Sequence, residues 1–133
     1  MSFHPYLFFG GTCREAFTRY REVLGGELVL LQFDQMGSAD GVPADRVGWI
    51  AHAALKLGDD LLMGSDDPVA DPFGPVRGMM VNLALGDAAE AQRVFAAIAD
   101  GGTIAQPMAA TEWSPAFGMC TDRFGTPWMI SAA

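Results

Sequence analysis

The candidate metal ligands in this 133-residue chain are His4, His52, Asp66, Glu112 and Asp122, and they are far apart in the sequence. A catalytic divalent ion usually needs three protein ligands, and Lys56, on the same predicted strand face as His52 and Ile50, disfavours a cation there. Asp122 precedes a hairpin turn, where aspartate commonly accepts hydrogen bonds from backbone amides. These residues by themselves give little support for a metal site.

The candidate nucleophiles also lack neighbours that would activate them. Cys120 stands on an alternating strand, where we expect a buried and inert thiol, because a reactive thiolate needs a histidine or a cation beside it. Ser114 and Ser131 lack the context of a nucleophile elbow. Glu112 and Trp113 are more suggestive, because an acid beside a large aromatic ring can orient a polar or cationic ligand. The alternative is a surface acid next to a packed ring.

The elements that must position these side chains occur twice. Residues 12–15 read TCRE and residues 87–90 read DAAE, and each motif places an oxygen-bearing side chain three residues before Glu, as in a capping box. Apolar side chains then recur with helical spacing over about 13–24 and about 88–100. A Gly-Gly pair follows each predicted helix, as expected at a helix end. The chain therefore contains a duplicated strand–helix unit.

Three further strands follow each predicted helix. Each half continues with an alternating run and then a hairpin, which is indicated by a short glycine-containing connection between apolar runs. A polar, glycine-rich loop at 34–48 lengthens the first half, and the Asp- and Pro-rich segment 66–78 is typical of a linker. We predict an α+β fold in a single domain, residues 1–133, with one βαβββ module at about 1–66 and another at about 78–133.

Strand alternation predicts which side chains share a face. One set is aliphatic and should pack under the helices, whereas the other mixes aromatic rings, methionines and a few polar groups. The mixed set comprises His4, Tyr6, Phe8, Met80, Asn82, Met129 and Ser131. Such a mixture is typical of a small-molecule pocket, and Asn82 is the expected polar anchor because an unpaired buried amide costs roughly 1–3 kcal/mol. The alternative is that these side chains fill the curved sheets or a dimer interface.

The composition excludes several classes of partner. The net charge of −8 argues against nucleic acid, because no basic patch is present to displace phosphate counterions. No apolar run approaches the length of a membrane span, so we expect no membrane association. The two cysteines are far apart and form no C-x-x-C motif, which favours free thiols in a reducing compartment. We therefore expect a cytoplasmic protein.

Three segments resemble one known group of proteins: PYLFFGGTCREAFTRYREVLGGEL at 5–28, IAHAALKLGDDLLMGSD at 50–66 and WSPAFGMCTDRFGTPWMIS at 113–131. They resemble the vicinal oxygen chelate superfamily, which includes glyoxalase I, bleomycin- and fosfomycin-resistance proteins and extradiol dioxygenases, and within it the PhnB-like branch. The resemblance implies two βαβββ modules whose mixed sheets curve into a half-closed, barrel-like arrangement around a cavity. It also implies a homodimer.

Glyoxalase-type relatives hold a divalent metal with four inward side chains from the first and last strands of each module. The matching positions here are His4, then Met63 or Ser65, then Met80 or Asn82, and Met129. Thioethers suit Cu(I) rather than the harder ions that activate oxygens, so we predict no metal and no cofactor. Some relatives are named after demethylubiquinone methyltransferase, but this chain has no Gly-rich nucleotide loop and is too short for a doubly wound sheet.

The prediction is a cytoplasmic, homodimeric PhnB-like protein that binds an unidentified small organic molecule, with any catalytic activity left open. The candidate ligand-binding residues are His4, Tyr6, Phe8, Met63, Met80, Asn82, Glu112, Trp113 and Met129. One alternative is a metal-dependent lyase, isomerase or dioxygenase, which would need at least three inward His or Glu side chains. Another is a resistance protein that sequesters a cationic drug, which the acidic charge and the aromatic residues permit.

Overall fold

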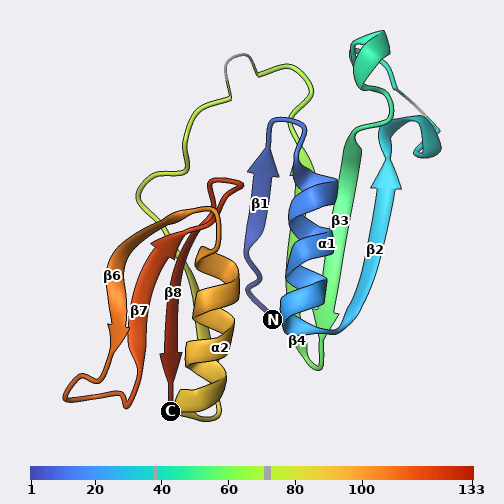
Figure 1. The fold of residues 1–133 in the computed structure, drawn as a ribbon. Helices are drawn as coiled ribbons and strands as arrows, with labels where there is room; N and C mark the ends of the chain where they lie inside the picture. The colour runs from blue at the N-terminus through green and yellow to red at the C-terminus, as the bar shows by residue number, and fades with distance from the viewer. Residues whose placement is uncertain (38, 71–72) are drawn as a thin grey trace. The chain divides into compact units, whose positions relative to one another are not determined.

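The computed structural model describes residues 1–37, 39–70 and 73–133, and these form two compact units, Met1–Gly74 and Pro75–Ala133 (Figure 1). Within the described residues, each unit has one α-helix and one four-stranded mixed sheet. The boundary lies within the predicted linker at 66–78, of which residues 71 and 72 fall outside the described residues, as does residue 38 of the predicted loop. The duplicated sequence pattern thus produces a duplicated α+β fold.

The sheet of unit 1 has the strand order β1-β4-β3-β2. Strands β1 and β4 are parallel, whereas the other two pairs are antiparallel. Two short 3-10 helices occupy parts of the predicted loop at 34–48. The elements of unit 1 are β1 (Tyr6–Phe9), α1 (Cys13–Leu24), β2 (Glu27–Gln32), η1 (Phe33–Gln35), η2 (Ala44–Arg46), β3 (Ile50–Leu57) and β4 (Asp60–Asp66).

Unit 2 repeats this topology with the strand order β5-β8-β7-β6, so the predicted βαβββ order of both halves is confirmed. Strands β5 and β8 are parallel, and β8, β7 and β6 are antiparallel. Within the described residues, no helix is long and apolar enough to span a membrane. The elements of unit 2 are β5 (Val81–Leu85), α2 (Ala88–Ala99), β6 (Thr103–Ala109), β7 (Phe117–Thr121) and β8 (Pro127–Ala132).

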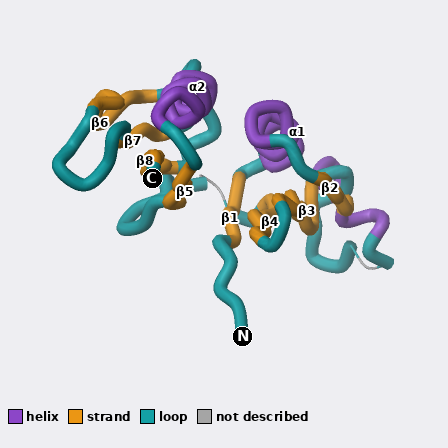
Figure 2. Tube along the Cα trace, turned by 90° about the horizontal axis from the view of Figure 1, so that it is seen from below, coloured by secondary structure: helices purple, strands orange, loops and turns teal. Residues whose placement is uncertain are grey.

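Each helix covers one face of the sheet in its own unit (Figure 2). In unit 1 the buried ring of Phe17 packs edge to face against Phe9 and Tyr20, with ring centroids 6.1 and 5.5 Å apart. Gly64 permits this approach, since a Cβ atom there would lie 2.8 Å from the Phe17 ring. In unit 2 the buried core includes Trp128 and Ile130. Of the strand side chains predicted to lie under the helices, Phe9, Trp128 and Ile130 are buried, whereas those of β5, such as Leu83, are only partly buried.

The first helix is capped by a residue from a distant strand. The Thr12 side chain, predicted to begin a capping box, makes no capping hydrogen bond. The buried carboxylate of Asp66 takes its place: Oδ1 accepts hydrogen bonds from the backbone N–H groups of Gly11 and Cys13 at 2.9 and 3.0 Å, and Oδ2 accepts one from Ile50 at 2.9 Å. Asp66, the last residue of β4, thereby joins the start of α1 to the start of β3. The prediction that Thr12 caps this helix was wrong.

Two other aspartates behave as predicted. Asp87 caps α2 by accepting a hydrogen bond from the Glu90 N–H at 2.8 Å. Asp122 accepts hydrogen bonds at Oδ1 from the N–H groups of Phe124 and Thr126, at 2.9 and 3.0 Å. Its Oδ2 also accepts one from Nε1 of the buried Trp128 at 2.9 Å, which the sequence did not indicate. Asp122 is therefore structural and is not available as a ligand.

A β-bulge changes the predicted alternation of β3. His52 pairs with Leu31, but the next pair is Ile50 with Gln32, so Ala51 is an extra residue on β3. A bulge breaks the period of two, and Ile50 is 1% exposed whereas His52 is only partly buried. The prediction that Ile50 and His52 share one face was therefore wrong.

Replacing Asp66 with Asn should lower the free energy of unfolding by about 3 kcal/mol, because an amide accepts at one oxygen only and its NH2 group would face a backbone donor. Urea denaturation measures the difference. Asp87→Asn is the matched control, since asparagine caps helices about as well as aspartate and should cost less than about 1 kcal/mol. Equally small effects at both positions would contradict the role assigned to Asp66.

Candidate functional site

The face of the first sheet that α1 leaves uncovered is apolar and accessible. We call it the open face of unit 1. Strand pairing aligns Tyr6, Met63, Ala54 and Val29 in one row across all four strands. Phe8 on β1 and Val29 on β2, the two edge strands of this sheet, are each 53% exposed, so large apolar side chains are accessible at both edges of the face. Its members are Tyr6, Phe8, Val29, Leu31, His52, Ala54, Met63 and Ser65, which is paired with Phe8.

One polar pair lies on this open face. The Tyr6 hydroxyl and Nδ1 of His52 form a hydrogen bond of 3.0 Å, and the two rings are 5.7 Å apart. The Phe8 ring lies 5.3 Å from that of Tyr6, so three rings form a continuous group. When the phenol donates to Nδ1, the imidazole carries its proton on Nε2 and can donate to a ligand. The pair could therefore recognise one hydrogen-bonding group of a largely apolar molecule.

The open face of unit 2 repeats the arrangement with different side chains. Asn82, Met129, Met119 and Gln106 form a row across its four strands. On the next row Phe117 and Ser131 are paired, and the Trp113 ring stands edge to face against Phe117 with centroids 5.8 Å apart. Trp113 itself is 73% exposed. We call this surface, made of Asn82, Gln106, Phe117, Met119, Met129 and Ser131, the open face of unit 2.

The structure brings some of the predicted site residues together within each unit. Tyr6, Phe8 and Met63 share the open face of unit 1, and Asn82 is paired with Met129 on that of unit 2. Because Asn82 is exposed, its amide can reach water, so the argument from a costly buried amide fails. The other candidates are not placed by a strand: His4 and Met80 precede β1 and β5, and Glu112 lies exposed beside Trp113 in the loop before β7.

The hydrogen bond between His52 and Tyr6 was not predicted from the sequence, where His52 was considered mainly as a metal ligand. The pairing with Tyr6 depends on the sheet order, which places β4 between β1 and β3. A lone histidine on an alternating strand carries no signal of a partner 46 residues away. Phe117 and Met119, also missed, could have been found from the alternation of the strand FGMCT at 117–121.

The donor groups do not fit a divalent ion that activates substrate oxygens. Among the described residues, no three His, Cys, Asp or Glu side chains gather closely enough to hold a metal. The positions that match ligands in glyoxalase-type relatives carry His4 and, on β4 and β8, Met63 and Met129. Thioether sulfur is a poor ligand for hard divalent ions. The side chains of the open faces are therefore suited to apolar contacts and hydrogen bonds.

The other potential nucleophiles have structural roles. Both cysteines are free and buried. Burial raises the pKa of the Cys13 thiol, with a further contribution from Asp66, and burial together with Asp122 raises the pKa of Cys120 to about 11. Ser114 is buried, and its Oγ lies 2.7 Å from the carbonyl oxygens of both Ala116 and Ala132. None of these groups is poised to attack a substrate.

The fold is that of the glyoxalase and bleomycin-resistance proteins, and the match to relatives extends over nearly the whole chain. A family model described as 3-demethylubiquinone-9 3-methyltransferase matches residues 1–131. The protein YjdN of Escherichia coli K12 is 33% identical over 141 residues, which cover 98% of this chain and 95% of YjdN. The chain therefore belongs to this family, which is the PhnB-like branch of the vicinal oxygen chelate superfamily.

Two solved structures have the same fold as this chain. The crystal structure of PA1353 from Pseudomonas aeruginosa is 41% identical, with a TM-score of 0.89, and covers 99% of this chain and 97% of PA1353. A PhnB protein from Bacillus cereus is 24% identical with a TM-score of 0.82 over the full length of both chains, and supports the fold alone. The predicted superfamily is therefore confirmed.

The thiols of Cys13 and Cys120 should not react with Ellman's reagent in the native protein at about pH 8, because both are buried, whereas both should react in urea. Burial favours the protonated form of both thiols, so the cysteines of the unfolded chain lose their protons at a lower pH than those of the folded protein. Stability is thus retained below the ordinary cysteine pKa of 9.0 and falls as the pH rises toward the folded value of about 11 at Cys120. Rapid labelling of the native protein would contradict this placement of the thiols.

Proposed function

We propose that this protein binds a small, largely apolar organic molecule on the open face of unit 1, without a resident metal or cofactor. The observation that carries the proposal is the exposed apolar surface around one polar pair, Tyr6 and His52. Ligand sites are typically apolar with a few polar groups that fix orientation. An aromatic molecule with one hydrogen-bonding group fits this surface, because it can stack on Phe8 and bond to His52.

The open face of unit 2 is a second candidate surface within the same proposal. Asn82, Gln106 and Ser131 supply its polar groups. Met129 and Met119 give it an adaptable apolar lining, and Trp113 supplies an exposed ring. Met63 has the same adaptable role on the open face of unit 1. Surfaces of this kind favour a range of related molecules over one rigid ligand.

The residues between β1 and α1 do not fit methyl transfer, although the family description names that reaction. The glycines between β1 and α1 are accounted for by close packing: a Cβ atom on Gly10 would meet Phe73 at 2.6 Å, and one on Gly11 would meet Trp49 at 2.9 Å. The amides at the start of α1 already donate to Asp66, so they are not free to hold a cofactor phosphate. Binding is the function that these residues support.

Phe8→Ser should weaken binding of an aromatic ligand at least about tenfold, because the loss of a buried phenyl contact costs about 1.5–3 kcal/mol. Ligands are first found by native mass spectrometry of the purified protein and by thermal-shift screening of small aromatic compounds. Phe3→Ser is the matched control, since Phe3 is 92% exposed and precedes β1. Equal binding by wild type and Phe8→Ser, or binding that chelator treatment abolishes, would contradict the proposal.

We also propose a homodimer. Each four-stranded sheet ends in two edge strands, β1 and β2 in unit 1 and β5 and β6 in unit 2. Unpaired strand edges favour association with another chain unless they are covered. The regular pairing of β2 along residues 27–31 leaves a straight edge, whereas β6 has two irregularities and Pro107. Of these two strands, β2 is therefore the better candidate for contact between copies.

Multi-angle light scattering at micromolar concentration should give about twice the mass of one chain, and this mass should persist on dilution to the lowest detectable concentration. Val29→Lys, on the exposed face of β2, should shift the population toward the monomer if β2 lies in the interface. A wild-type protein that remains monomeric at all concentrations would overturn the homodimer.

A further inference from the structure

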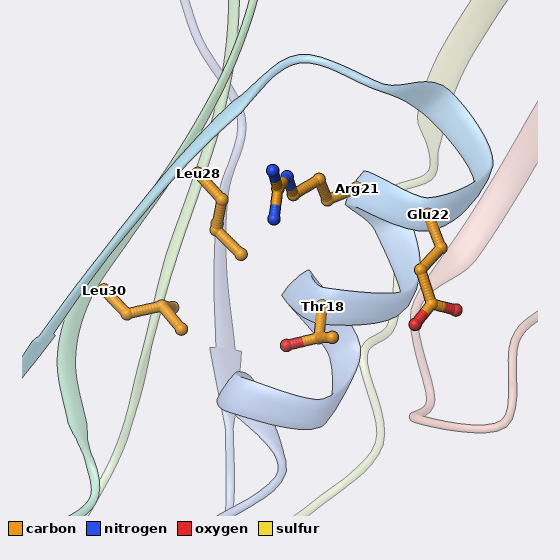
Figure 3. A pocket seen from close by; sticks show the side chains of 5 residues that line it. All are labelled: Thr18, Arg21, Glu22, Leu28 and Leu30. Carbon is orange, nitrogen blue, oxygen red and sulfur yellow. The ribbon is translucent and has the colours of Figure 1, made fainter.

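A second hollow in unit 1 lies on the side of the sheet that carries α1, between that helix and the edge strand β2 (Figure 3). We call it the α1–β2 groove; its volume is about 600 Å³, within the range of small-molecule sites. It is lined by Thr18, Arg21, Glu22, Leu28 and Leu30. Leu28 and Leu30 are two residues apart on β2 and thus form an apolar wall facing the helix.

The polar groups of the α1–β2 groove are arranged unequally. Figure 3 shows the Arg21 guanidinium extending from the helix toward Leu28, and Thr18 lying one turn earlier on the same side of the groove. The Glu22 carboxylate points away from the leucines and pairs with Arg19 at 3.4 Å. The groove therefore presents a cation and a hydroxyl beside an apolar wall.

The Arg21 side chain has no ion pair or hydrogen bond to any other described residue. In contrast, Arg123 pairs with Asp100 at 3.0 Å, and Arg46 donates to the carbonyl oxygen of Pro68 at 2.8 Å. A guanidinium has a planar fork of N–H donors that matches the two oxygens of a carboxylate. Arg21 is thus a free carboxylate-binding group in a chain whose net charge is −8.

We propose that the α1–β2 groove binds a small monocarboxylate with an apolar tail. The carboxylate accepts hydrogen bonds from the Arg21 guanidinium and the Thr18 hydroxyl, and the tail lies over Leu28 and Leu30. Arg19 neutralises Glu22, so the positive charge of Arg21 remains among these three ionised groups and favours an anion. This site is separate from the open face of unit 1, since it lies on the helix side of the sheet.

The duplicated fold supplies an internal comparison. An equivalent hollow lies between α2 and β6, and Ile104 there stands 76 residues after Leu28. Its lining includes Phe95, Ala96 and Met108, and the charged residue among its described lining is Asp100. Both units thus have a hollow between the helix and an edge strand, but among the described lining residues an unpaired cation distinguishes the groove of unit 1. The groove of unit 2 should therefore reject a carboxylate.

Titration of ¹⁵N-labelled protein with sodium octanoate tests the proposal. Octanoate should produce saturable shifts of the Thr18, Arg21 and Leu28 amides and leave those of Ala96 and Ile104 unchanged. Arg21→Gln should weaken binding at least about tenfold, whereas Arg14→Gln, on the same helix but outside the groove, should bind like the wild type. 1-Octanol, which has the same tail without the charge, should bind at least about tenfold more weakly than octanoate.

Three results would overturn the carboxylate site: shifts centred on the open face of unit 1, equal affinities of wild type and Arg21→Gln, or equal affinities for octanoate and 1-octanol. Arg21→Gln changes an exposed position of α1, so loss of folding is not expected. Phe8→Ser should bind octanoate as tightly as the wild type. The two sites therefore succeed or fail independently.

Discussion

A single helix covers each four-stranded sheet, and this limit on coverage determines most features of the molecule. The helix buries one face of its sheet around residues such as Phe17 and Trp128, and among the described residues no helix covers the opposite face. One α-helix is narrower than four strands lying side by side. The helix therefore also leaves a groove beside the outermost strand on its own side of the sheet. The open faces and the two grooves are consequences of the same geometry.

Buried carboxylates connect the segments that this geometry leaves separate. Asp66 accepts three backbone hydrogen bonds from the start of α1 and from β3, and Asp122 holds a hairpin turn and the Trp128 indole. The oxygens of such a buried carboxylate accept hydrogen bonds from several backbone N–H groups that would otherwise bond to water. Both residues looked like possible metal ligands in the sequence, yet their oxygens are already occupied by backbone and indole donors. These two aspartates thus stabilise the scaffold.

The two halves of the chain have diverged in side chains while keeping one topology. On the open faces, the row of Tyr6 and Met63 in unit 1 has its counterpart in the row of Asn82 and Met129 in unit 2, so a phenol is replaced by an amide while the methionine is kept. Beside the helices, Arg21 stands in one groove and Asp100 in the other. A duplicated scaffold can therefore offer surfaces of different chemistry, because the core positions and the surface positions of a strand alternate and can change separately.

The sequence by itself determined the βαβββ order and the helix bounds, which agree to within one residue, because apolar periodicity and glycine stops depend on local spacing. It also indicated that Tyr6 and Phe8 share a face and that Asp122 serves its own turn. Only the tertiary structure decided that Asp66 and not Thr12 caps α1, that a bulge separates Ile50 from His52, and that His52 meets Tyr6. Each of these depends on which strands lie next to one another, and sheet order is a long-range property that spacing along the chain does not encode.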